Sequence, residues 1–180
     1  PDNAKQQLPV ILTGPAQSKD YFDEIVAFVE QTLGQEALDK FEVIIDDPQL
    51  VASKLKAGMQ SVRDYRRQEG DAYYFNWTLR IDPDFQAPFA PTHDNMAALN
   101  LHLDQPKQQL AANLRRAFSG IVAGNVKDEG IRAIKQHGVF ELSGDPQLMQ
   151  KMDALLAAFV RQGRMKLPGS TYTPCYTIKT

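Results

Sequence analysis

Two short apolar segments near the start of the chain constrain its fold more than any other feature. Residues 9–14 read Pro-Val-Ile-Leu-Thr-Gly, and residues 41–45 read Phe-Glu-Val-Ile-Ile. Runs of this kind are typical of strands in parallel sheets, which helices cover on both faces. An amphipathic helical pattern follows each run, so the order strand–helix–strand–helix predicts a doubly wound α/β sheet.

The two helices have recognisable ends and apolar faces. We expect the first to begin at a Ser18 cap and to end at Gly34, and the second to begin at Asp46-Asp47-Pro48 and to reach about Arg67. Their predicted apolar faces are Phe22, Ile25, Phe28, Val29 and Leu33 in the first helix, and Leu50, Val51, Leu55, Met59 and Val62 in the second.

Two parallel strands are too few for a sheet of this type, which usually has about five or six. The sequence also begins at Pro1 without an initiator Met. We therefore expect the chain to begin in mid-domain, with further strands supplied by an upstream part of its own chain or by another chain. The predicted fold class is α/β, with the C-terminal end of a Rossmann-like doubly wound parallel sheet in residues 1–70 and a mainly helical C-terminal domain in residues 71–180.

The second region has its own pattern. Residues 72–81 are aromatic and strand-like, and prolines then punctuate residues 83–91 with phenylalanines between them. Helices are predicted from a Thr92 cap, from Pro106 to about Asn125, over 126–137, and from Asp145-Pro146 onward. Residues 139–142 alternate like a short strand, and the tail from residue 165 is expected to be extended.

Composition narrows the classes of function. The chain carries a formal net charge of −2, and its aromatic residues are not interleaved with basic ones, which argues against nucleic-acid binding. No segment approaches the roughly 20 apolar residues of a membrane span. Because the single cysteine, Cys175, cannot form an internal disulfide, a reducing compartment is expected, and we predict a cytoplasmic location. Cys175 is interpreted as a packed thiol in preference to a nucleophile.

Four residues lie at the end of the two apolar runs or directly after it, where open α/β sheets bind ligands. They are Thr13, Gly14, Asp46 and Asp47. Helix capping is an alternative explanation for the two aspartates, and Gly14 can either admit a ligand or turn the chain. The sequence predicts a strand-end pocket and leaves these alternatives open.

Arginines form two further groups. Arg63, Arg66 and Arg67 fall at the end of the second helix, where they can bind phosphate or complement the helix dipole. Arg115 and Arg116 precede a series of small residues, 119–124, that favours close helix packing within the fold or between subunits. His93, His102 and His137 are scattered, and no dinucleotide-binding, P-loop or metal-ligand spacing occurs. No cofactor and no metal are predicted.

Four long blocks carry a resemblance to a known family. They are residues 8–15, 70–77, 114–127 and 164–169, which include the strings LPVILTGP, GDAYYFNW, LRRAFSGIVAGNVK and RMKLPG. They resemble the carboxy-terminal part of the bacterial pyrimidine/purine nucleotide 5'-monophosphate nucleosidases of the Lonely Guy group, also called lysine decarboxylase-like. The likeness extends over essentially all 180 residues.

The resemblance implies hydrolysis of the N-glycosidic bond of nucleoside monophosphates of the AMP, GMP and CMP type, giving base and ribose 5-phosphate. The family's Pro-Gly-Gly-x-Gly-Thr loop and catalytic glutamate have no matching position here, so no catalytic residue is transferred and the chain alone is expected to be inactive. The resemblance also implies a homo-oligomer and a response to guanosine tetra- and pentaphosphate alarmones. Residues that could meet such an effector are Arg63, Arg66, Arg67, Arg115, Arg116 and Lys127. An effector-binding and oligomerisation module is thus the alternative to a part of the enzyme, and base preference stays open.

Overall fold

The computed structural model describes residues 9–68, 87–169 and 171–179, which group into two units. The first unit lies within residues 1–82, and the second within residues 83–180, to which residues 31–33 also belong. The predicted strand at residues 72–81 and the proline at position 83 lie outside the described residues. Among the helices that the model describes, none is long and apolar enough to cross a membrane.

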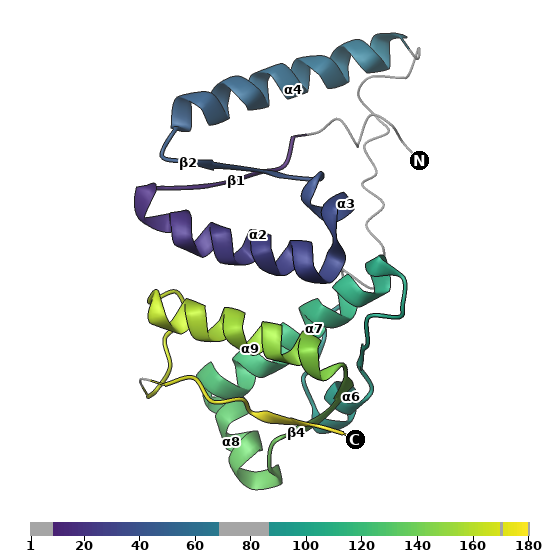
Figure 1. The fold of residues 1–180 in the computed structure, drawn as a ribbon, viewed down its shortest axis with the longest axis vertical. Coiled ribbons are helices and arrows are strands. Elements are labelled where there is room, and N and C mark those ends of the chain that lie inside the picture. Colours follow the sequence, from purple (N-terminus) through teal and green to yellow (C-terminus); the bar gives the residue numbers. More distant parts are fainter. Residues whose placement is uncertain (1–8, 69–86, 170, 180) are drawn as a thin grey trace. The chain divides into compact units, whose positions relative to one another are not determined.

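The first unit is built on a parallel strand pair. Strand β1 (Ile11–Gly14) pairs with β2 (Glu42–Ile45) in a register that places Gly14 opposite Ile45. A 3-10 turn, η1 (Ala16–Ser18), leads into α2 (Lys19–Leu33), α3 (Gln35–Leu38) precedes β2, and α4 (Pro48–Gln68) follows it. Helices α2 and α4 lie on opposite faces of the pair (Figure 1). The predicted α/β alternation is confirmed, and the Rossmann-like assignment stays a prediction.

Both predicted ends of α2 are confirmed in position. Gly34 ends the helix at φ +84°, a left-handed conformation that glycine adopts without steric cost, and its N–H bonds to the carbonyls of Val29 and Glu30, both at 3.1 Å. Ser18 occupies the N-cap position, but its side chain makes no capping bond. The 3-10 turn enters the helix instead, with Ser18 N–H donating to Pro15 O at 2.8 Å.

The predicted apolar face of α4 is wrong for three of its five residues. Val62 is buried, whereas Leu50, Leu55 and Met59 have exposed fractions of 41%, 42% and 41%. The helix approaches the start of the described chain closely at Gly58, where an added Cβ would lie 2.6 Å from Pro9 Cγ. Gly58 and Val62 thus lie on the packed side of α4, and Leu55 and Met59 lie on its more exposed side.

The second unit is mostly helical, as predicted, but it also contains a three-stranded parallel sheet. Its strands are β3 (Asn100–Leu101), β4 (Phe140–Gly144) and β5 (Tyr176–Ile178), in the order β3-β4-β5. Its helices are α6 (His93–Ala97), α7 (Lys107–Val126), α8 (Asp128–His137) and α9 (Pro146–Arg161). Only β4 was expected from the sequence, because β3 and β5 are too short to show an alternating pattern.

The core of this unit is built from side chains of both its helices and its strands. Those with the least exposure come from α6, β3, α7, β4 and α9: Met96, Leu101, Leu110, Ile121, Phe140, Leu142, Leu148, Met149, Met152 and Leu156. The small residues of α7 permit close contacts, since a Cβ on Gly124 would lie 2.8 Å from Cys175 Sγ and one on Gly120 would overlap Met96. The predicted close packing is confirmed within the fold.

Candidate functional site

Parallel pairing brings the predicted strand-end residues of the first unit to one edge. Gly14 lies opposite Ile45, and Asp46 N–H continues the ladder to Gly14 O at 2.9 Å. Thr13, Gly14, Asp46 and Asp47 therefore meet at the carboxyl ends of β1 and β2. The sequence predicted this juxtaposition from strand direction alone.

Local structure accounts for three of these four residues. A Cβ at Gly14 would lie 2.9 Å from Ser18 Cβ and 3.2 Å from Phe22, so glycine is needed for packing against the following turn. Asp47 caps α4, because its Oδ1 accepts the N–H of Leu50 at 2.8 Å. Asp46 is exposed and holds φ at +57°, a conformation in which Asp is enriched among non-glycine residues. Asp46, like Thr13 and Asp47, is exposed to solvent, and it is the carboxylate of the group for which the structure shows no capping bond.

The arginines of α4 have unlike surroundings although they lie within one helical turn. Arg63 and Arg67 are exposed, and Arg67 Nη1 lies 3.8 Å from Asp64 Oδ1. Arg66 is buried, with an exposed fraction of 2%. Two exposed guanidinium groups at a helix C-terminus can receive an anion from solvent, whereas Arg66 belongs to the packed interior.

The other basic candidates lie in the second unit on α7 and at its end. Arg115 Nη2 donates to Ala87 O at 3.4 Å, and Arg116 is half-buried. Lys127 is exposed at the junction where α7 ends and α8 begins. Within this unit the three side chains are thus spread along a helix of 20 residues and do not form one cluster.

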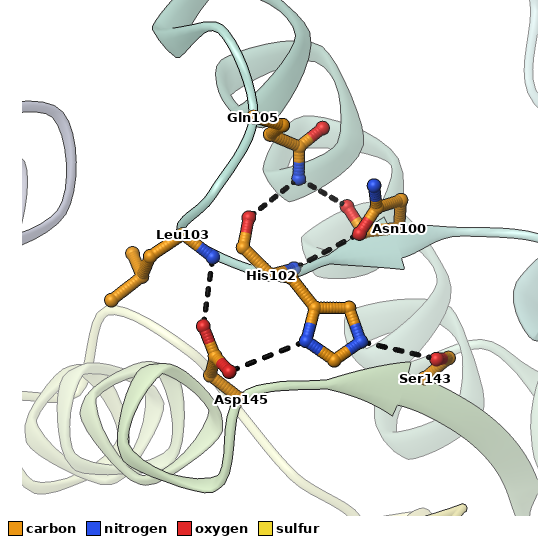
Figure 2. Close-up of polar contacts among 6 residues, drawn as sticks. All are labelled: Asn100, His102, Leu103, Gln105, Ser143 and Asp145. Carbon is orange, nitrogen blue, oxygen red and sulfur yellow. Dashed lines mark hydrogen bonds and ion pairs between the residues drawn. The ribbon is translucent and has the colours of Figure 1, made fainter.

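A polar constellation that the sequence reading missed lies at the carboxyl ends of β3 and β4. His102 Nδ1 lies 3.2 Å from Asp145 Oδ1, and His102 Nε2 lies 3.3 Å from Ser143 Oγ (Figure 2). The other carboxylate oxygen, Asp145 Oδ2, accepts the N–H of Leu103 at 2.7 Å. His102 thus bridges an anionic and a hydroxyl side chain from the neighbouring strand.

Hydrogen bonds hold the His102 turn in place. His102 N–H donates to Asn100 Oδ1 at 3.2 Å, and Gln105 Nε2 donates to the carbonyls of Asn100 at 2.8 Å and His102 at 2.7 Å (Figure 2). The imidazole therefore projects from a braced backbone, in spite of being 41% exposed.

Asp145 was predicted as the N-cap of α9, and this position is confirmed although the side chain makes no capping bond. The residue occupies that position, but its carboxylate turns away from the helix to Leu103 and His102. The N–H of Leu103 first, and then His102, lower the pKa of the Asp145 carboxyl below its usual value. The carboxylate is therefore anionic at neutral pH.

The sequence offered one signal for this constellation, the spacing of its residues. Asn100 and His102 are two residues apart, as are Ser143 and Asp145, and the second residue of each pair directly follows the strand that holds the first. The four come together only through the register that sets Asn100 opposite Ser143. Because β3 spans two residues, this spacing could not be distinguished from a loop.

Cys175 and two tyrosines secure the C-terminal tail. Tyr172 and Tyr176 each donate a hydroxyl hydrogen bond of 2.7 Å to Asp153 on α9. Burial raises the pKa of the Cys175 thiol to about 11, and Sγ accepts from Asn125 at 3.3 Å. The thiol is protonated at neutral pH, which confirms its interpretation as a packed residue.

The model of one family matches residues 59–179, and its description is the C-terminal region of pyrimidine/purine nucleotide monophosphate nucleosidase. This match covers well over half of the chain. The chain belongs to this family. It is also similar to the pyrimidine/purine nucleotide 5'-monophosphate nucleosidases of Escherichia coli strain K12, strain O6:H1 and strain O157:H7, at 56% identity over all 180 of its residues.

The chain spans 40% of the length of each of these relatives. The family match includes the arginines of α4 and α7 and the whole His102 constellation, and the strand-end group around Asp46 precedes it. Within the described residues, no three His, Cys, Asp or Glu side chains gather as they would around a metal ion.

Proposed function

We propose that the chain is the C-terminal part of a nucleotide 5'-monophosphate nucleosidase that hydrolyses the N-glycosidic bond of AMP-, GMP- and CMP-type nucleotides. The observation that carries the proposal is the 56% identity, over the full chain, to three nucleosidases. The products are the free base and ribose 5-phosphate. A reaction of this type needs a carboxylate for the oxocarbenium-like transition state and a clamp for the phosphate.

In this proposal the strands β1 and β2 extend a Rossmann-like sheet whose catalytic Gly-rich loop lies on an earlier segment of a longer protein. Helices cover both faces of β1 and β2, as they do in doubly wound sheets, and this supports the assignment. Ligands of such sheets bind at the carboxyl ends of the strands, next to the point where the connecting helices change from one face to the other. The exposed carboxylate of Asp46, with Thr13, Gly14 and Asp47, then borders the nucleotide site. Asp46 is suited to accept hydrogen bonds from ribose hydroxyls.

A chimera tests the proposal directly. The chain would replace the matching C-terminal 40% of the Escherichia coli K12 relative, and ribose 5-phosphate release from AMP, GMP and CMP would be measured. We expect the folded chimera to be active and the 180-residue chain alone to be inactive. A folded chimera without activity, or turnover by the isolated chain, would overturn the proposal.

Effector binding is the second candidate function, because exposed guanidinium groups stand at the end of α4. Arg63 and Arg67 are the accessible pair, and in the second unit Arg115, Arg116 and Lys127 extend the candidate set. A guanosine tetra- or pentaphosphate offers the multiple phosphates that forked guanidinium groups bind. The same regions are proposed to support a homo-oligomer, in a cytoplasmic enzyme.

Calorimetric titration of the chimera with guanosine tetraphosphate separates this candidate from the first. Arg63→Ala/Arg67→Ala is the informative variant, since both side chains are exposed and their loss leaves the core intact. Lys56→Ala, an exposed cation on the same helix, is the matched control. We expect binding that weakens at least about tenfold, which corresponds to roughly 1.4 kcal/mol, in the arginine variant alone. Binding that is absent from the wild type, or equal in both variants, counts against the α4 site.

A further inference from the structure

The hydrogen bonds around His102 fix which of its ring nitrogens carries a proton. Asp145 is anionic and can only accept, so His102 Nδ1, at 3.2 Å from Oδ1, must be the donor. In the neutral imidazole Nε2 is then the acceptor. The group that faces Nε2, at 3.3 Å, is Ser143 Oγ, which must donate its hydroxyl proton. The order is carboxylate, imidazole, hydroxyl.

This order is the arrangement that activates a serine. A nucleophilic hydroxyl needs a base within hydrogen-bond reach, and the base needs a third group that fixes its tautomer and orientation. Distances of 3.2 and 3.3 Å suit a site without substrate, in which such bonds are often long. We propose that Ser143, His102 and Asp145 form a serine-type acyl-transfer site that cleaves small carboxylic esters.

The position in the fold favours reaction at Ser143. The three side chains stand at the carboxyl ends of parallel strands, and α9 begins directly after Asp145, three residues beyond the serine. The positive end of the α9 dipole therefore lies at this strand end, where it favours negative charge on a reacting carbonyl oxygen. The side chains of His102 and Asp145 are 41% and 37% exposed, so a substrate from solvent can reach the base.

The openness of the site sets the class of substrate. Leu103, whose N–H bonds to Asp145, is 40% exposed, so the surface beside the three side chains is open to solvent. A small, unhindered ester matches a surface site of this kind better than a long chain or a peptide does.

The proposed reaction balances without a further reactant except water. Ser143 Oγ attacks the ester carbonyl carbon while its proton moves to His102 Nε2. The carbon–oxygen bond to the alcohol then breaks, and the alcohol leaves with that proton, so an acyl group stays on Ser143. Water attacks the acyl carbon and gives a proton to Nε2, the bond to Oγ breaks, and Oγ recovers its proton. The net products are a carboxylic acid and an alcohol, and Asp145 acts as a positioning residue throughout.

A structural role makes a different prediction for the same residues. Asp145 already joins the two strand ends through the 2.7 Å bond from Leu103 N–H, which does not require the serine. If the cluster only joined the strands, Ser143 would react no faster than any other surface serine. Reactivity at one atom therefore distinguishes the two roles.

The experiment labels the full chain with a fluorophosphonate probe and maps the adduct by mass spectrometry, with p-nitrophenyl acetate hydrolysis measured in parallel. We expect one adduct per chain, on Ser143, that is retained in the control Ser53→Ala on the exposed side of α4. Ser143→Ala should lose the adduct and the esterase activity. His102→Gln, which removes the base and keeps a polar side chain, should slow labelling by about 10²-fold.

The pH profile supplies a readout that a structural role would not change. Labelling of the wild type should slow in acid, because a protonated imidazole cannot accept the serine proton, and His102→Gln should be flat over the same range. Circular dichroism confirms that each variant is folded. No adduct on Ser143 in the folded wild type, or equal labelling rates in wild type and His102→Gln, would overturn the proposal.

Discussion

The two units of the chain differ in how far the apolar side chains around their parallel strands are buried. Nearly all of the buried apolar residues among the described residues belong to the second unit, whereas only Ile44 and Val62 belong to the first. Leu50, Leu55 and Met59 of the first unit each stay about two-fifths exposed. Full burial of one such side chain stabilises a fold by roughly 1.5–3 kcal/mol. The comparison implies that the second unit holds most of the stability of the chain.

The largest expected effect comes from one pair of identical substitutions. Leu142→Ala removes a side chain with an exposed fraction of 0% from the second unit, and Leu55→Ala removes one that is 42% exposed from the first. We expect urea unfolding to show a loss of about 2–5 kcal/mol for Leu142→Ala. For Leu55→Ala the change should stay within roughly 0.5 kcal/mol. Equal losses would mean that the two units are covered alike.

A glycine contact between α7 and α8 gives the next effect. An added Cβ at Gly130 would overlap the carbonyl group of Ala123 and lie 3.0 Å from Gly124 N, so the two helices must separate. Gly130→Ala should cost about 1–3 kcal/mol in thermal unfolding. This loss reverses the usual gain from alanine in a helix. Gly169→Ala, which meets nothing within 4 Å, is the control and should be close to neutral.

Because of the two tyrosines that donate hydrogen bonds to Asp153, we expect the second unit to lose stability at high pH. Burial first, and then the Asp153 hydrogen bonds, raise the pKa of Tyr172 and of Tyr176 above the usual value near 10. The folded state therefore keeps protons that the unfolded state loses, so this stability is present below pH 10 and declines above it. Each Tyr→Phe change should cost about 1.5 kcal/mol at neutral pH. The double variant should also flatten the alkaline decline.

Tyr65→Phe on α4 is the matched control for that pair, because it leaves the Asp153 contacts intact. Chemical denaturation at neutral pH and at pH 10–11 provides the measurement. An alkaline decline that is as steep in the double variant as in the wild type would contradict the assignment to Tyr172 and Tyr176.

The smallest effect is expected on the folding stability at low pH. The pKa of Asp145 is lowered in the folded state, so the stability that it contributes is present above its unfolded value and is lost as pH falls through the folded pKa, below 3.8. Asp145→Asn should reduce the acid sensitivity of the second unit only slightly, since the side chain is 37% exposed. Acid unfolding followed by circular dichroism measures the midpoint, with Asp104→Asn as control. An unchanged midpoint would show that the Leu103 and His102 contacts do not couple to folding.

Local chemistry made much of the fold predictable. Gly34 ends its helix, Asp47 and Thr92 cap theirs, and the apolar runs form β1 and β2 in the expected parallel arrangement. The strand-end residues meet because strand direction decides where the carboxyl ends lie. Each of these features depends on residues that are neighbours in sequence or on a strong pattern, and a sequence displays both.

The sequence by itself thus determined the order of the longer helices and of β1, β2 and β4, several of their ends, and the resemblance to the family. Only the tertiary structure decided that Gly58 of α4 lies against Pro9, that Arg66 is buried, and that the Asp145 carboxylate bonds to Leu103 and not to its own helix. It also brought His102 to Ser143 across 41 residues and to Asp145 across 43. The physical reason is that contacts between distant segments depend on sheet register and on close approach of backbones, and neither leaves a periodic trace along the chain.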